Sequence, residues 1–309
     1  MTTQMARGYL GSVAKGVLAG LLLSAALHAA QQDSLSRYRD PAELVRTAVQ
    51  NEIKASNDPS SRFLFRGVKT NPRGSTTKLY VETKDATAGV VVGYDGKPLT
   101  PEQQQDEQAR IDRFLKDPAE LRKKQAQERE TAERSLRITR ALPDAFLYEY
   151  AGEEKGSEGI GRAGEPLVKL SFRPNPKYDP PSRVEEVLRG MQGFVLVDAV
   201  HGRLASIDGT LSKDVGFGWG ILGHLDRGGR VVLHQQRLES GTWIFSSVSF
   251  RVTGKILLIK SFSSESTEIF SGFRKVPSDL SFAQGLELLK KEMTTGGSNG
   301  HSPERGTKK

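Results

Sequence analysis

The chain has 309 residues, with 45 basic and 37 acidic side chains, a formal net charge of +8 and no cysteine. The lack of cysteine excludes disulfide stapling, thiolate metal sites and lipid attachment at a cysteine, so a hydrophobic core must hold the fold together. Lys and Arg are interspersed with Asp and Glu, without the basic patch and interleaved aromatics of a nucleic-acid-binding protein, so no nucleic acid partner is expected.

Residues 1–30 are predicted to be a signal peptide. Arg7 and Lys15 form a basic segment, residues 16–27 form an apolar run, and cleavage is expected after Ala29 or Ala30. The apolar run is shorter than the about 20 residues that a transmembrane helix needs, and no later segment comes closer. We therefore expect a periplasmic or secreted protein with no membrane span after cleavage; an uncleaved N-terminal anchor is the alternative.

The first predicted elements are a helix and three strands. Asp40, Pro41 and Glu43 form a helix start, with an N-cap acid, proline at the first helical position and an acid in the first turn. The apolar residues of this helix fall on one face. Alternating or apolar runs predict strands over residues 62–69, 78–84 and 88–94, with turns at 71–74 and 95–96.

Residues 101–141 form a charged insertion that is predicted to be helical. Thr100 and Gln103 fit a capping box, and a second helix start follows at Asp117. Because the apolar stripe is narrow, we expect a charged helical hairpin of coiled-coil type that lies on the surface or projects from it. Such a segment is either a solvated face or a partner-binding arm.

Further strands are predicted over residues 145–150 and 166–172, with a mobile loop over 152–165 and a short helix from Ser182. A six-strand meander then runs from Gly193 to Lys275, over 194–197, 204–211, 230–238, 242–250, 255–260 and 267–273. Its turns are predicted at His201-Gly202, which supplies a positive-φ pair, at 239–241 and at 253–254. A final amphipathic helix carries Phe282, Leu286, Leu289 and Met293, and residues 294–309 form a disordered tail.

These elements predict an α+β fold in a single domain over residues 31–293. About eleven antiparallel strands form a curved sheet, which must bury one face and protect its edges. The three amphipathic helices fit the contents of an incompletely closed barrel. We therefore expect an open half-barrel covered by helices, with the charged insertion added to it.

The sequence contains little that indicates catalysis or cofactor binding. The glycines at 159–164 and 218–223 have the spacing of a dinucleotide-binding loop, but each segment precedes a strand instead of a helix. No histidine has metal-ligand spacing and no Gly-x-Ser-x-Gly elbow occurs, so no cofactor, no metal and no enzymatic activity are expected. Asp198 and Asp208 flank the His201 hairpin and could meet across it, although such pairs usually face solvent. A hydrolase that gathers His201 or His234 with carboxylates is the remaining enzymatic alternative.

Phe217, Trp219 and Ile221 alternate with glycines, which allow the backbone to bend tightly or to lie against another surface. One interpretation is a crossover loop whose Trp219 plugs the end of the core. The other is a hydrophobic flap at the mouth of a ligand cavity.

The order of elements supports a family resemblance. A signal peptide, a helix, a strand meander, Gly202-Arg203, Ile207-Asp208-Gly209, a glycine-rich link and paired strands with Trp243 resemble the superfamily of periplasmic lipoprotein carriers and receptors of the Lol type and their sigma-factor regulatory relatives. The resemblance implies an open β half-barrel whose concave apolar face, lidded by helices, accepts acyl chains of lipoproteins or other lipids. The chain differs in its charged insertion and in having no assignable arginine that senses an acyl chain.

We therefore expect reversible, non-catalytic binding of a lipid or acylated protein in an apolar half-barrel. The predicted lining consists of aromatic residues on the strands, for each of which ordinary core packing is the alternative: Phe63, Phe65, Trp243, Phe245 and Phe250. The alternative function is an envelope interaction protein whose cavity is filled by its own helices and which binds a protein partner through Pro101–Arg140.

Overall fold

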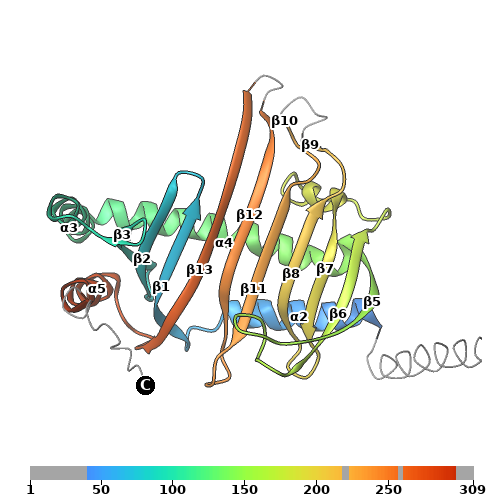
Figure 1. Cartoon of the computed structure of the whole chain (residues 1–309), viewed down its shortest axis with the longest axis horizontal. Helices are drawn as coiled ribbons and strands as arrows, with labels where there is room; N and C mark the ends of the chain where they lie inside the picture. Colours follow the sequence, from blue (N-terminus) through green and yellow to red (C-terminus); the bar gives the residue numbers. More distant parts are fainter. Residues whose placement is uncertain (1–39, 218–222, 257–259, 297–309) are drawn as a thin grey trace, which may run out of the picture.

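The computed structural model describes residues 40–217, 223–256 and 260–296. The predicted signal peptide and cleavage site, Trp219, Ile221 and all but the start of the predicted tail lie outside these residues. The predicted α+β class with one open antiparallel sheet is confirmed (Figure 1). In the described residues, no helix is both long enough and apolar enough to cross a membrane.

The elements follow one another in this order: α2 (Pro41–Ser56), β1 (Arg62–Asn71), β2 (Gly74–Glu82), β3 (Thr87–Tyr94), β4 (Lys97–Pro98), α3 (Pro101–Lys116), α4 (Pro118–Ala145), β5 (Phe146–Lys155), β6 (Pro166–Pro174), the 3-10 helix η1 (Glu185–Gly190), β7 (Met191–Asp198), β8 (Arg203–Leu211), β9 (Val215–Phe217), β10 (Gly223–Leu225), β11 (Arg230–Arg237), β12 (Trp243–Ile256), β13 (Lys260–Val276) and α5 (Phe282–Gly296).

The strand order is β4-β3-β2-β1-β13-β12-β11-β8-β7-β6-β5, and the short β9–β10 hairpin pairs with β12. The C-terminal strand β13 therefore lies in the middle of the sheet. It pairs with β1 on one side, with Arg62 opposite Val276, and with β12 on the other. The long hairpin β12–β13 thus joins the N-terminal strands to the strands that follow the helical insertion (Figure 1).

Two hydrophobic cores lie on opposite faces of this sheet. One contains Leu44 and Val45 of α2, Leu142 of α4, and Val195 and Val197 of β7. The other is formed by α3, α5 and strands β1–β3, with these residues: Leu64, Val81, Ala88, Val90, Ile111, Phe282, Leu286 and Leu289. We call the two surfaces the α2 face and the α5 face.

The register shows that the faces differ, because directly opposed residues of antiparallel strands project to the same side. Opposed pairs connect these residues across the sheet: Val68, Ile269, Ser247, His234, Ser206 and Leu196. Val68 shares its face with Leu64, which packs against α5. Leu196 lies on the side opposite Val195 and Val197, which pack against α2.

Helix α4 connects the two cores. Leu121 near its N-terminus packs with the α5-face core, and Ile138 and Leu142 near its C-terminus pack with the α2-face core. Residues 129–135 between them are all exposed, so this stretch spans the middle of the sheet without close packing. Figure 1 shows α4 crossing behind β1, β13, β12 and β11.

The predicted helices of the insertion are confirmed, but the predicted hairpin is wrong. Thr100 and Gln103 form the expected capping box, and the Asp117 side chain caps α4. The two helices turn a corner at Asp117 (Figure 1), and α4 then packs beside α2. The reason is that each helix buries its sparse apolar residues against a sheet core instead of against the other helix.

The predicted turn at 253–254 and the separate strand over 255–260 are wrong, since β12 runs without interruption to Ile256. Gly254 pairs with Phe262 of β13 and Leu225 of β10. A Cβ at Gly254 would lie 2.1 Å from the His224 carbonyl oxygen, so glycine is needed here for close strand approach.

Three smaller predictions need correction. Only Gly202 of the predicted His201-Gly202 pair has a positive φ, of 58°. The helix predicted from Ser182 is the short 3-10 helix η1, in which Leu188 is the buried anchor. The loop predicted as mobile is tied to β11, since Gly161 N donates to Gln235 O at 2.8 Å.

Candidate ligand-binding groove

A groove of about 950 Å³ lies on the α2 face, over the ends of β1, β11, β12 and β13. Ala55 and Ser56 at the end of α2 line one side, and Glu128 of α4 lines another. Since residues 129–135 of α4 are exposed all round, the helix leaves space over the middle strands. The groove is therefore a part of the α2 face that the described helices leave open.

The floor of the groove is aromatic. It is lined by Phe63, Phe65, Trp243, Phe245, Phe270 and Phe273. Phe65 is its centre: its ring stacks on Phe273 with centroids 5.2 Å apart and on Tyr80 at 5.3 Å, and it meets the edge of Phe270 at 5.8 Å. Such ring pairs add stability beyond the area that they bury, which favours this packed arrangement of the floor.

The structure brings four of the five predicted lining residues together. Phe63 is a buried part of the floor, whereas Phe245 is 49% exposed and forms part of the open surface. Phe250 lies farther along β12, opposite Val231 and Ser266, and does not line the groove. The binding role of these residues stays a prediction.

Phe270 and Phe273 were missed by the sequence analysis. They lie three positions apart on β13, which is the wrong spacing for one face of a regular strand. A register shift between Leu64 and Arg66, together with Gly272 at a φ of 66°, brings both rings to Phe65. The available signal was the Phe-Ser-Gly-Phe pattern, in which a glycine marks a β-bulge.

Of the predicted flap residues, Phe217 ends β9. Its side chain, like Trp219 and Ile221, lies outside the described residues. The interpretation of this segment as a flap stays a prediction.

Charged residues of both signs form the rim. The acidic ones are Glu52, Asp58, Glu82, Asp85 and Glu128, and the basic ones are Arg62, Lys84 and Arg203. Arg203 donates to both carboxylate oxygens of Glu52, at 2.8 and 2.9 Å, and its guanidinium lies 5.5 Å from the Trp243 ring centroid. This pair fixes the end of α2 to the groove wall.

Glu82 is a partly buried acid of the rim. Burial raises the pKa of its carboxyl above the usual value, while the hydrogen bond from Phe63 N and the charge of Arg62 act in the opposite direction. Arg62 donates to the carbonyl oxygens of Thr83 and Ser278, which holds its guanidinium at the same wall. The groove thus combines an apolar floor with polar groups at its edge.

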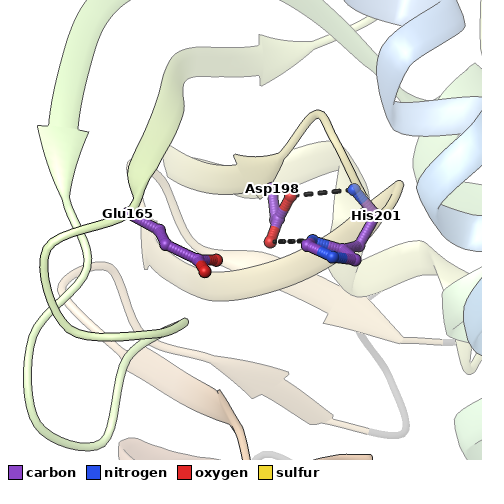
Figure 2. Close-up of side chains that lie close together, drawn as sticks. All are labelled: Glu165, Asp198 and His201. Atoms are coloured by element: carbon purple, nitrogen blue, oxygen red, sulfur yellow. Dashed lines mark hydrogen bonds and ion pairs between the residues drawn. The ribbon is translucent and has the colours of Figure 1, made fainter. Parts of the chain in front are cut away.

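Two histidine sites lie outside the groove. His234 Nδ1 is 3.0 Å from Ser247 Oγ on the α5 face, and burial lowers the pKa of His234. Asp208 does not meet Asp198, because the register of β7 and β8 places Asp208 opposite Phe194. Arg230 donates to both Asp208 oxygens, at 2.9 and 2.6 Å. Asp198 instead contacts His201, with its Oδ2 2.8 Å from His201 Nδ1 (Figure 2).

Comparison with known proteins gives only distant likeness. No protein-family model and no curated protein matches the sequence. Among solved structures, the chain is similar to a DUF1329 family protein from Desulfovibrio piger, with 12% identity, 77% of this chain and 94% of that chain covered, and a TM-score of 0.26. It is also similar to the complex structure of Pseudomonas aeruginosa MucA/MucB, with 9% identity, coverage of 81% and 97%, and a TM-score of 0.21. At these TM-scores the likeness assigns no function to this chain.

Proposed function

We propose that this protein binds an amphiphilic ligand reversibly in the groove, outside the cytoplasm and without catalysis. The ligand is a lipid or the acyl chain of an acylated protein. The single observation that carries this proposal is the half-exposed Phe245, which belongs to the packed aromatic floor of a groove of about 950 Å³. Pockets for small ligands have volumes of about 300–1,000 Å³, and this groove is at the upper end.

The expected affinity for an acyl chain is low enough for a protein that picks up a ligand and releases it again. Burial of an acyl chain contributes about 0.8 kcal/mol per methylene, and a single myristoyl-length chain therefore binds only marginally and reversibly. The mixed charges at the rim can hold a zwitterionic headgroup or the peptide part of an acylated protein. The apolar floor supplies affinity and the rim sets orientation.

Native mass spectrometry with lipid extraction tests the proposal, on protein purified from its own envelope fraction. Phe245→Glu places a charge in the groove and should abolish co-purifying acyl lipid while the fold is retained. Phe194→Glu is the matched control, because Phe194 is 45% exposed but lies on the α5 face. A protein that carries no lipid and takes up none when lipid is added would exclude this function.

A second candidate is recognition of a protein partner through the charged helices. The supporting observation is the exposed stretch 129–135 of α4, which is charged and free of close packing. A photo-crosslinker at Thr131 should then give one defined adduct in the envelope, and a crosslinker at the exposed Lys97 of β4, outside the groove, should not. Equal labelling from both positions would rule out a specific surface on α4.

A further inference from the structure

Three side chains with metal-binding atoms converge at one end of strands β7 and β8. Glu165 ends the β5–β6 loop, Asp198 ends β7, and His201 lies in the turn before β8. One ligand atom from each residue lies within 4.8 Å of the other two. Figure 2 shows the three side chains pointing toward one another, with Asp198 between the others.

The turn fixes Asp198 before any ligand binds. Its Oδ1 accepts hydrogen bonds from the backbone N–H groups of Val200, at 3.0 Å, and His201, at 2.9 Å. The side chain is only 3% exposed. Its Oδ2 is thereby directed at the imidazole of His201, whose side chain is 33% exposed.

The β5–β6 loop is fixed just as firmly. Gly161 N donates to Gln235 O at 2.8 Å, and Arg237 N donates to Gly161 O at 2.9 Å. Arg237 Nη1 also donates to both Glu165 oxygens, at 3.3 and 3.2 Å, and Arg162 Nε lies 3.8 Å from Glu165 Oε1, so this carboxylate lies next to β11 between two guanidinium groups. The backbone of the β5–β6 loop is therefore set by hydrogen bonds that involve no side chain of the cluster, whereas the β7–β8 turn is set by Asp198 Oδ1 and leaves Oδ2 for the ion.

The donor set indicates the chemical class of the ion. One imidazole and two carboxylates are ligands of Zn²⁺ and neighbouring divalent transition metals, whereas Mg²⁺ and Ca²⁺ prefer oxygen alone. We propose that Glu165, Asp198 and His201 form a binding site for a divalent transition-metal ion of the Zn²⁺ class. The exposed side of His201 leaves the remaining coordination positions to water.

The required adjustment is small. Ligand atoms on one tetrahedral Zn²⁺ lie about 3.4 Å apart, because each is about 2.1 Å from the ion. The separation of up to 4.8 Å therefore closes by about 1.4 Å at most. Glu165 is 37% exposed and would provide this movement by exchanging one of its two contacts with Arg237 for the ion. His201 exchanges its contact with Asp198 Oδ2 for the ion and binds as the neutral imidazole.

The ion would join the β5–β6 loop to the β7–β8 turn beside the groove. Ile160 of this loop packs in the cluster that Trp243 also contacts, and Arg203 follows the turn directly. Metal binding would therefore stiffen the groove wall formed by Trp243 and Arg203. The site does not depend on what the groove binds.

The test is isothermal titration of the purified, chelator-treated full chain with Zn²⁺, in the presence of excess Mg²⁺. We expect one bound ion per chain, with affinity lowered at least about tenfold in His201→Gln and in Glu165→Gln. His224→Gln is the matched control, because His224 Nε2 also contacts a carboxylate, Asp226 Oδ1 at 3.1 Å, outside this cluster. Hydrogen exchange gives a second readout: Zn²⁺ should slow exchange over residues 156–165 in the natural protein but not in His201→Gln.

Absence of Zn²⁺ binding by the natural protein would overturn the proposal. Unchanged affinity in both His201→Gln and Glu165→Gln would also overturn it, since the ion would then bind elsewhere. Loss of Zn²⁺ binding in His224→Gln alone would also overturn it, because the ion would then bind at His224. Competition by Mg²⁺ at equal concentration would contradict the assigned class of ion.

Discussion

The guanidinium of Arg203 lies 5.5 Å from the ring centroid of Trp243, at the point where β8 and β12 meet the groove. Glu52 of α2 holds this guanidinium from the other side and also accepts from Leu204 N at 3.1 Å. The Arg203 and Glu52 side chains are each 14% exposed. The groove wall thus depends on one partly buried charge pair.

Glu52→Ala should therefore destabilise the protein. It leaves the Arg203 guanidinium without its carboxylate in a poorly solvated place, and we expect the free energy of unfolding to fall by about 2–3 kcal/mol in urea denaturation. Glu43→Ala is the control on the same helix, because its pair with Arg46 is exposed and should contribute less than about 1 kcal/mol. Equal losses in the two variants would show that burial does not strengthen the Glu52 pair.

The raised pKa of Glu82 predicts that the effect of Glu82→Gln on the free energy of unfolding depends on pH. Because burial raises its pKa in the folded state, the ionised carboxylate destabilises the fold, and this cost grows as pH rises above the ordinary value of 4.5. Glu82→Gln keeps an oxygen that accepts from Phe63 N and removes the charge. We expect it to raise the stability at about pH 7 and to give little gain at about pH 4, where the carboxyl of the natural protein is protonated.

Urea denaturation of Glu82→Gln at both pH values measures this difference, with Glu239→Gln in the exposed β11–β12 turn as the control. A stability change that is the same at the two pH values would mean that hydrogen-bond geometry at Phe63, and not charge, governs this position.

Gly254→Ala tests the close approach of β10 to β12. A methyl group there would meet the His224 carbonyl oxygen, so the β9–β10 hairpin must shift or detach. We expect a loss of about 1–3 kcal/mol and faster hydrogen exchange in residues 223–225, with Thr253→Ala as the neighbouring control. Unchanged exchange at His224 and Leu225 would disprove the pairing of these strands.

The two cores should unfold together, because one sheet connects them. Leu170→Ala in the α2-face core and Leu286→Ala in the α5-face core each remove a fully buried side chain and should each cost about 2–5 kcal/mol. Both variants should keep a single transition, with coincident fluorescence and circular dichroism curves. Two separate transitions in either variant would contradict the predicted single domain over residues 31–293.

Patterns within short stretches of sequence, such as helix caps and alternating apolar residues, predicted most elements of this fold. Capping at Asp40, Thr100 and Asp117 was readable because each cap depends on residues within one helical turn. The course of β12 was misread because the glycine at 254 serves a contact with His224, which lies far away in sequence. A glycine alone does not reveal whether it permits a turn or a close approach.

In the candidate sites, too, features that depend on nearby residues were predicted, and features that depend on residues distant in sequence were missed. Phe63, Phe65, Trp243 and Phe245 were predicted from their positions on strands, but the Phe273 ring reaches the groove through a bulge that has no periodic signal. Glu165 and His201 belong to different loops, and long-range contacts such as the hydrogen bonds between the β5–β6 loop and β11 bring them together. Metal-ligand spacing in the sequence could not indicate this cluster.

The central position of β13 has a consequence for how the chain folds. Strands β1–β3 and β5–β8 pair with near neighbours and can form early, but Arg62 finds its partner only when Val276 has been synthesised. Contacts so distant in sequence slow folding. The aromatic floor at Phe65, Phe270 and Phe273 therefore forms in a late step, and a nascent chain that ends before β13 has no groove.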